Sequence, residues 1–236
     1  EKLDELVDLV SEQTDLLIEK CGAEKNRLIA ACISTSGIID YAEQTLRFSP
    51  FSPSWGTNVP LTSLLRPCFG ENTIILMENV GKLTARTLLQ QTELLERRVL
   101  GVFTSWGLSG CLMEGGRILN GKDSLIGEFG HMILSPRDEE RCGCGSHGCF
   151  EKLVSIDRIR RRTRELVPVF PNSCLFEEPS SELSVSKVFE ASAQGDSCAR
   201  LIVDELARLF AVAMRNITLV FDPDVVVIQG DYASAD

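Results

Sequence analysis

Residues 127–151, with the sequence GEFGHMILSPRDEERCGCGSHGCFE, hold the most specific pattern in the chain. Three cysteines fall within eight residues, at Cys142, Cys144 and Cys149, and His131 lies eleven residues before the first of them. Three thiolates and one imidazole make a full tetrahedral ligand set for zinc, and a closed set of four protein ligands is typical of a structural site. The glycines between the cysteines allow the backbone to wrap tightly around one ion. The sequence therefore predicts structural zinc bound by these four residues.

Two alternatives remain open from the residues alone. The three cysteines could be reduced thiols that lie close together without a metal. His147, inside the cysteine-rich segment, is a second candidate for the nitrogen ligand. We favour His131, because a distant ligand closes a loop whereas His147 would strain the short segment around it.

The composition indicates a globular protein. Of the 236 residues, 44% are apolar and 25% are charged, which excludes a disordered or fibrous chain and fits one large domain or two small ones. The net charge of −10 gives no reason to expect nucleic acid on this part of the protein. Acidic residues interrupt the first apolar stretch, Leu3 to Ile18, so we expect neither a signal peptide nor a membrane partner. An odd count of nine cysteines then favours reduced thiols and a cytoplasmic location.

Helical and strand patterns alternate along the chain. Short apolar runs predict strands over residues 28–34, 73–77, 98–104 and 225–228, and a glycine-spaced stretch predicts a hairpin over 107–121. Apolar stripes with helical spacing predict helices over 3–21, 81–91, 158–167, 186–193 and 197–218. This alternation is typical of an α/β protein, with two lobes meeting near residue 95.

Several of these segments together resemble the signature of the ROK family (repressors, open reading frames and sugar kinases). The similarity rests on the 127–151 segment, on a glycine turn at 36–40, on Glu78-Asn79 and on 222–227, which leads into and includes the last strand. It implies an α/β, two-lobed actin-like (ribonuclease H-like) fold of the ATPase superfamily. The small lobe would be residues 1–97, without its leading strands. The large lobe would be residues 98–236, without its C-terminal part and with a zinc-binding insertion at 131–149.

The resemblance also implies where a sugar binds. Family members hold the sugar in the cleft between the lobes, and their sugar ligands fall on Asn79, Glu128, His131 and Glu151 of this sequence. The chemistry suits hydroxyl groups, because carboxylates accept hydrogen bonds, an amide donates and accepts, and a zinc-bound imidazole offers its other N–H.

The chain departs from the kinases of the family at three places. The aspartate that takes the proton from the sugar hydroxyl is replaced by Val80, so we predict no catalytic residue there. The glycine-rich turn that approaches phosphate contains Trp106, and Asp231 stands beside the predicted adenosine site. The leading Asp-x-Gly-x-Thr phosphate loop is not in the chain. We therefore expect no catalysis and no ATP or Mg²⁺ cofactor, and zinc as the only metal.

These departures favour the sugar-sensing effector domain of a ROK-family transcriptional repressor. A sugar or sugar phosphate would be the effector, operator DNA would bind through an N-terminal domain not in this chain, and family members are usually homodimers or homotetramers. The alternative is a ROK sugar kinase of the glucokinase or N-acetylhexosamine kinase type, which phosphorylates a hexose with ATP. A third interpretation is a sugar-binding or structural family member without a DNA partner.

One basic cluster lies outside these motifs. Five arginines, at 158, 160, 161, 162 and 164, crowd one predicted helix. We interpret them as a solvated helix face balanced by the surplus of acidic residues, and DNA, a phosphorylated sugar or an acidic partner as alternatives.

Overall fold

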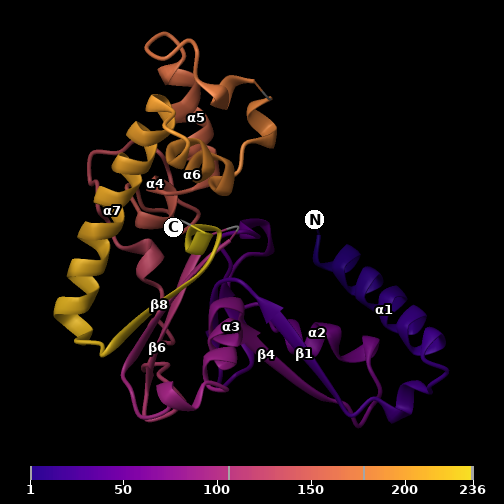
Figure 1. Ribbon diagram of the computed structural model, residues 1–236. Helices are drawn as coiled ribbons and strands as arrows, with labels where there is room; N and C mark the ends of the chain where they lie inside the picture. Colours follow the sequence, from indigo (N-terminus) through magenta and orange to yellow (C-terminus); the bar gives the residue numbers. More distant parts are fainter. Residues whose placement is uncertain (1, 106, 178, 235–236) are drawn as a thin grey trace. The chain divides into compact units, whose positions relative to one another are not determined.

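The structure is a computed structural model that describes residues 2–105, 107–177 and 179–234 (Figure 1). The chain divides into two compact units. Unit 1 is Glu1–Arg86 with Asn120–Leu125, and unit 2 is Thr87–Leu119 with Ile126–Asp236. The predicted division after residue 97 differs from this one, because residues 87–97 group with unit 2 and the 120–125 segment returns to unit 1. A break in sequence periodicity marks the end of an element and does not show which core the connecting residues join.

Unit 1 is built around a pair of parallel strands, β1 (Ala30–Thr35) and β4 (Ile74–Asn79), in register from Ala30 opposite Ile74 to Thr35 opposite Asn79. Because the carboxyl ends of parallel strands meet at one edge, the turn after β1 and the helix after β4 begin side by side. The remaining elements of the unit are α1 (Leu3–Lys20), the antiparallel pair β2 (Ile38–Asp40) and β3 (Thr45–Phe48), α2 (Leu61–Leu65) and the start of α3 (Val80–Leu88).

The core of unit 1 collects apolar side chains from the strands and from α2. Ile39, Leu46, Val59, Leu61, Leu65, Cys68 and Met77 are buried together. The first half of α1 covers this core with Leu3, Leu6, Val7 and Val10. Farther along the predicted stripe, Leu17 is exposed, so only the first part of the stripe packs within the described residues.

Unit 2 contains a four-stranded sheet in the order β7-β6-β5-β8. The hairpin β5 (Val99–Thr104) and β6 (Leu108–Glu114) is antiparallel, β7 (Arg117–Ile118) extends it, and β8 (Val225–Gly230) pairs in parallel with β5. Every residue of β5 is buried, as its continuous apolar sequence requires.

Helices complete the unit, and the longest of them packs against the other three. They are α4 (Phe150–Leu153), α5 (Ile156–Leu166), α6 (Val185–Ala193) and the long α7 (Ser197–Phe221) (Figure 1). The predicted apolar stripe of α7 faces the core, with Ile202, Leu206 and Ala213 buried against Leu100, Phe150 and Ile159 among others.

Short 3-10 helices join these elements at Lys25–Arg27, Pro53–Trp55, Arg66–Cys68, Thr92–Leu94, Phe129–His131, Cys174–Phe176, Ser180–Glu182 and Asp231–Ser234. Among the helices in the described ranges, none has both the length and the hydrophobicity needed to cross a bilayer.

Candidate functional site

The four predicted zinc ligands lie together in unit 2. Their ligand atoms, from His131, Cys142, Cys144 and Cys149, are all within 4.8 Å of one another. His131 Nδ1 is 3.5 Å from Cys142 Sγ, and Cys144 Sγ is 3.6 Å from Cys149 Sγ. In a tetrahedral site with bonds of about 2.0–2.3 Å, neighbouring ligand atoms are roughly 3.5–3.8 Å apart. These two distances match a tetrahedral shell, and the whole set is close enough to surround one ion.

The electrostatics of the three thiols also fit a bound cation. Burial, with hydrogen bonds to Cys144 and Cys142, raises the pKa of Cys149, and burial raises the pKa of Cys142. Burial opposes ionisation of Cys144 as well, but hydrogen bonds from the backbone of Ser146 and from the other two thiols lower its pKa. A divalent cation among them would supply the charge that stabilises three thiolates at neutral pH.

A tight backbone turn holds the cysteines in place. The Cys142 N–H donates to the Ser146 carbonyl at 2.8 Å, and the Gly145 N–H donates to the Cys142 carbonyl at 2.9 Å. Gly148 has φ +68°, and a Cβ at this position would collide with the carbonyl oxygen of Ser135. A glycine is needed here because the segment that follows His131 runs directly against the segment that leads into Cys149.

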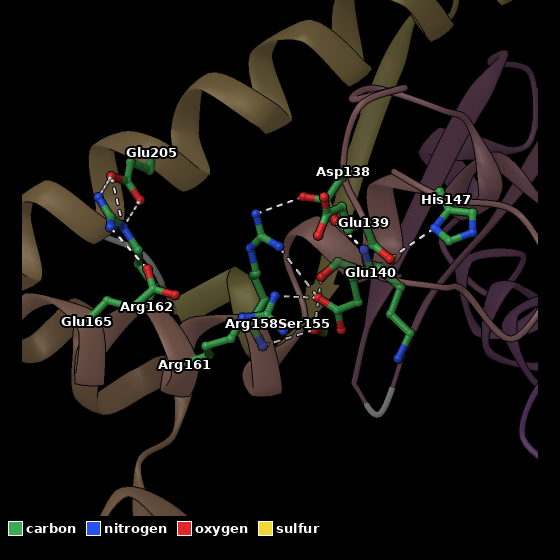
Figure 2. Close-up of polar contacts among 11 residues, drawn as sticks. Asp138, Glu139, Glu140, His147, Ser155, Arg158, Arg161, Arg162, Glu165 and Glu205 are labelled. Carbon is green, nitrogen blue, oxygen red and sulfur yellow. Dashed lines mark hydrogen bonds and ion pairs between the residues drawn. The ribbon is translucent and has the colours of Figure 1, made fainter.

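The structure separates the two candidate histidines. His131 ends the 3-10 helix Phe129–His131 and faces the thiols. His147 is exposed, and its Nδ1 is 3.0 Å from the carbonyl oxygen of Glu139 (Figure 2). In the described residues it is thus His131 that joins the metal-ligating group.

Glu128 lies on the other side of the His131 ring. Its Oε2 is 4.0 Å from His131 Nε2, and both side chains are partly buried. Gly127, with φ +99°, presses this segment onto β6, where a Cβ would collide with the carbonyl oxygen of Gly110. The spacing Gly-Glu-x-Gly-His therefore fastens Glu128 and His131 to the sheet, with the two ring nitrogens facing different groups.

Glu151 connects the group of three cysteines and His131 to the same strand. It lies on α4, which begins directly after Cys149, and its Oε2 accepts the Leu108 N–H at 2.9 Å. A carboxylate can accept about four hydrogen bonds, so Glu151 has acceptor capacity left for a hydroxyl group.

Asn79, the fourth predicted sugar ligand, lies in unit 1 and has a structural task. Its Oδ1 accepts the Gly81 N–H at 2.8 Å and the Lys82 N–H at 3.3 Å, which caps the N-terminus of α3. Its Nδ2 donates to the Gly37 carbonyl at 2.8 Å and so ties the glycine turn after β1 to the helix after β4. One amide hydrogen of Asn79 remains for a ligand.

Val80, at the predicted base position, is the first residue of α3 and is 43% exposed. The carboxylate nearest in sequence, Glu78, is only 9% exposed and is engaged on both oxygens. Its Oε1 accepts the Tyr41 hydroxyl and the Asn79 N–H, and its Oε2 pairs with Arg86 at 2.9 Å. Burial and the bond to Glu78 raise the pKa of Tyr41, which keeps this phenol neutral.

Lys82 is a notable residue that the sequence analysis did not single out. It is 2% exposed, its Nζ lies 3.4 Å from the Ser124 carbonyl oxygen, and it stands 5.1 Å from the centre of the Tyr41 ring. Its spacing of three from Ala85 and six from Leu88, both buried on α3, is the signal that could have placed it on the inner face.

The predicted phosphate turn closes on itself in unit 2. The Ser105 N–H donates to the Gly107 carbonyl at 3.0 Å, and Trp106 between them lies outside the described residues. The Tyr232 N–H donates to Thr104 Oγ1 at 3.1 Å, and the Tyr232 hydroxyl donates to the Val154 carbonyl at 2.6 Å. The hollow beside this turn, which Asp231 and Tyr232 also line, has a volume of about 20 Å³. That is room for about one water molecule.

Comparison with known proteins gives relatives of two kinds. The chain is 28% identical over 233 residues to a glucokinase of Thermotoga maritima, covering 97% of this chain and 71% of that protein. It is 34% identical over 142 residues to an N-acetyl-D-glucosamine kinase of Shigella flexneri, covering 56% of this chain and 43% of that protein.

Solved structures share the fold. A ROK family transcriptional regulator, described as a homologue of the E. coli MLC protein, has a TM-score of 0.78 at 21% identity and covers 98% of this chain and 57% of its own. A ROK family glucokinase from Streptomyces griseus, in complex with glucose and AMPPNP, has a TM-score of 0.76 at 22% identity, with coverage of 98% and 73%. This chain thus spans between about two fifths and three quarters of the length of these relatives.

The expected actin-like α/β fold is confirmed by these structures, which include both regulators and kinases. The family model described as "ROK family" matches residues 4–236, nearly the whole sequence. The chain belongs to the ROK family.

Proposed function

We propose that this chain is the sugar-sensing, non-catalytic effector domain of a ROK-family transcriptional repressor. The observation that carries the proposal is Val80 at the position where the kinases of the family place their catalytic aspartate. A valine side chain cannot accept the proton of a sugar hydroxyl, and general-base catalysis is typically worth about 10²–10⁴ in rate.

The surroundings of Val80 offer no ready substitute in Glu78. That carboxylate already accepts bonds from Tyr41 and the Asn79 backbone and pairs with Arg86. To act as a base, Glu78 would have to give up the hydrogen bonds from three donors. This loss costs more free energy for a buried carboxylate than for an exposed one.

The nucleotide side supports the same conclusion. A phosphate-binding turn needs open space bounded by backbone N–H groups. The turn at 104–107 instead borders a hollow of about 20 Å³ that Tyr232 and Asp231 line. A carboxylate at Asp231 would repel a triphosphate, so ATP and Mg²⁺ are not part of the proposal.

We propose structural zinc as the resident metal, held by His131, Cys142, Cys144 and Cys149. When bound, it would supply a fixed charge that stabilises the thiolates and orders the loop before α4. Glu128, His131 and Glu151 would then bind sugar hydroxyls on unit 2. Asn79 on unit 1 stays a predicted ligand through its remaining amide hydrogen.

The wider setting is proposed from the family. A sugar or sugar phosphate would be the effector, and operator DNA would be bound by a segment outside this chain. A cytoplasmic location and a homodimer or homotetramer are part of the same proposal. The helix α1 does not serve as the DNA reader in it, because Leu3, Leu6 and Val7 pack on the core of unit 1.

A sugar kinase is the second candidate, and the 28% identity to a glucokinase over 97% of this chain favours it. Calorimetric titration with glucose, N-acetylglucosamine and their 6-phosphates, beside an ATP-coupled assay with the same sugars, separates the two. We expect saturable binding of at least one sugar and ADP formation at background. Sugar-dependent turnover in the usual range of about 1–10³ s⁻¹ would establish the kinase. If no sugar bound, the sugar-sensing function would be excluded.

A further inference from the structure

Helix α5 carries the arginine cluster of the sequence, and its arginines divide into two groups (Figure 2). Arg158 and Arg161 face the loop that joins His131 to Cys142. Arg162 faces α7, where it pairs with Glu205 at 2.7 Å and with Glu165 of its own helix at 3.2 Å. Carboxylates thus pair with Arg158, Arg161 and Arg162, which fits the interpretation of a charge-balanced helix.

The first group holds the middle of the metal-binding loop. Arg158 Nη2 lies 2.8 Å from Asp138 Oδ2, and its Nη1 lies 3.5 Å from Glu140 Oε2. Arg161 Nη2 is 2.5 Å from the same Glu140 oxygen. Two guanidinium groups on one helix thus pair with two carboxylates that are two residues apart in sequence.

These carboxylates are less exposed to solvent than the carboxylates of surface ion pairs usually are. The side chains of Asp138 and Glu140 are 10% and 20% exposed. A carboxylate withdrawn from water depends on its partner, and loss of the partner leaves a desolvated charge. The Glu140 N–H also donates to Asp138 Oδ1 at 3.0 Å, so the two carboxylates belong to one hydrogen-bonded turn.

The same turn is fastened to the cysteine-rich segment. The carbonyl oxygen of Glu139 lies 3.0 Å from His147 Nδ1, and Arg141 forms an isolated bridge with His147. Residues 138–141 therefore stand between α5 on one side and the turn of Cys142 and Cys144 on the other.

We propose that Arg158 and Arg161 are positioning residues for the metal site. They act through Asp138 and Glu140 to keep His131 and Cys142 at ligand spacing. This inference rests on the zinc of the proposed function. Partners one step beyond the ligands commonly change metal affinity about 10–100-fold, and these arginines lie one step farther out.

Arg160 and Arg162 supply a matched control. A hollow of about 430 Å³, with Ile159 and Leu206 in its wall, lies among α5, α7 and the loop and is lined by arginines of both groups. Arg160 donates to the carbonyl oxygens of Ser181 and Leu183. The variants Arg160→Gln/Arg162→Gln therefore remove two arginines from the same helix without touching residues 138–140.

The experiment compares zinc release from the whole chain. Wild type, Arg158→Gln/Arg161→Gln and Arg160→Gln/Arg162→Gln are mixed with excess of a chromogenic chelator, and the cobalt-substituted forms are compared by their visible spectra. We expect release about tenfold faster and a changed cobalt band for the first pair only. A cycle of Arg158→Gln with Asp138→Asn should be non-additive, whereas Arg162→Gln with Asp138→Asn should be additive.

The rates of zinc release test whether Arg158 and Arg161 position the metal site. Equal release from wild type and Arg158→Gln/Arg161→Gln, or equally fast release from the control pair, would overturn the positioning role while leaving zinc in place. Wild-type protein that holds no metal would overturn both the zinc proposal and this one. If Arg158→Gln/Arg161→Gln does not fold, Asp138→Asn/Glu140→Gln tests the same contacts from the loop.

Discussion

At position 80 a valine occupies the first residue of α3, next to the asparagine that caps this helix. Replacing it with aspartate would restore a carboxylate where the kinases of the family have their base. We expect the Val80→Asp variant to stay at background in an ATP-coupled assay with hexoses. The reason is that the turn at 104–107 borders a hollow of only about 20 Å³ and Asp231 lines it.

The control measures the stability of the Val80→Asp variant, to show that any lack of activity does not come from unfolding. An acidic residue in the first turn of a helix is favourable by about 0.3–1 kcal/mol, so Val80→Asp should unfold at the same or higher urea concentration than wild type. Sugar-dependent ADP formation by the folded variant would show that the nucleotide side is intact, contrary to our proposal.

Asn79 offers a second test at the scale of one residue. Removing its side chain deletes the cap of α3 and the bond to Gly37, so Asn79→Ala should lower the free energy of unfolding by about 2 kcal/mol. Asn79→Asp keeps the capping oxygen and loses the amide donor, and about half of that loss is expected. Urea denaturation measures both.

Val80→Ala is the matched control, because it changes an exposed side chain at the adjacent position and should stay within about 0.5 kcal/mol of wild type. If Asn79→Ala proved as stable as Val80→Ala, the cap would contribute nothing and the ligand role of Asn79 would gain weight.

Single residues differ in how much of their role the sequence reveals. The grouping of His131 with Cys142, Cys144 and Cys149 could be predicted from local spacing, since three cysteines within eight residues leave few geometries. The bonds of Asn79 to Gly37 and of Lys82 to Ser124 join residues 42 apart in sequence, and periodicity carries no information at that range. For this reason the capping role of Asn79 and the burial of Lys82 appear only in the structure.

At the scale of elements, α7 depends on its N-cap. Asp196 accepts the Ala199 N–H at 2.9 Å, the Cys174 N–H at 3.0 Å and the Ser173 hydroxyl at 3.0 Å. Burial alone would raise the pKa of Asp196, but these hydrogen bonds outweigh it and lower the pKa below 3.8. A single carboxylate thus joins the start of α7 to the loop at 173–174.

The lowered pKa fixes the sign of a pH effect. Because the pKa of Asp196 is lower in the folded than in the unfolded state, its charge stabilises the fold. This contribution is complete above the unfolded-state pKa of about 3.9 and is lost as the pH falls through the folded-state pKa. Asp196→Asn, which keeps a capping oxygen, should therefore be about 1 kcal/mol less stable than wild type at pH 7. The difference should close as the pH falls through the folded-state pKa.

Urea unfolding of both proteins at several pH values measures this difference, with Asp204→Asn, an exposed change on the same helix, as the control. A difference in stability that stayed constant through the whole acid range, until both proteins unfold, would mean that the charge of Asp196 plays no part in the cap.

The elements themselves could be predicted well where the pattern is local. Strands expected at 98–104 and 225–228 are β5 and β8, and the helix expected at 197–218 is α7, ending at Phe221. The stripe of α1 was extended too far, since Leu17 is exposed. Helical spacing shows which residues share a face, but the length of the core beneath the helix decides how many of them are covered.

At the scale of the whole molecule, the division into units follows contacts that no local pattern shows. Asn120–Leu125 leaves the hairpin of unit 2 and groups with unit 1, where Ser124 accepts from Lys82 and Asp123 lies 3.5 Å from Arg47. A single domain boundary placed along the sequence cannot describe a later segment that belongs to the first unit.

Metal removal tests how far the zinc cluster acts through unit 2. We expect about one zinc per chain by elemental analysis. Chelation should weaken sugar binding about tenfold or more, because Cys149 caps the helix that carries Glu151 and His131 is 4.0 Å from Glu128. Hydrogen exchange should rise over residues 131–155 and stay unchanged in β1 and β4 of unit 1.

A matched pair of cysteine variants separates the metal from general thiol effects. Cys144→Ser removes a donor of the cluster and should reproduce the chelated state, whereas Cys174→Ser changes an exposed thiol outside it and should bind zinc and sugar as wild type does. Full sugar affinity in the metal-free protein would instead mean that the bond from the Leu108 N–H is sufficient to place Glu151. In that event the sheet rather than the metal would position the sugar ligands of unit 2.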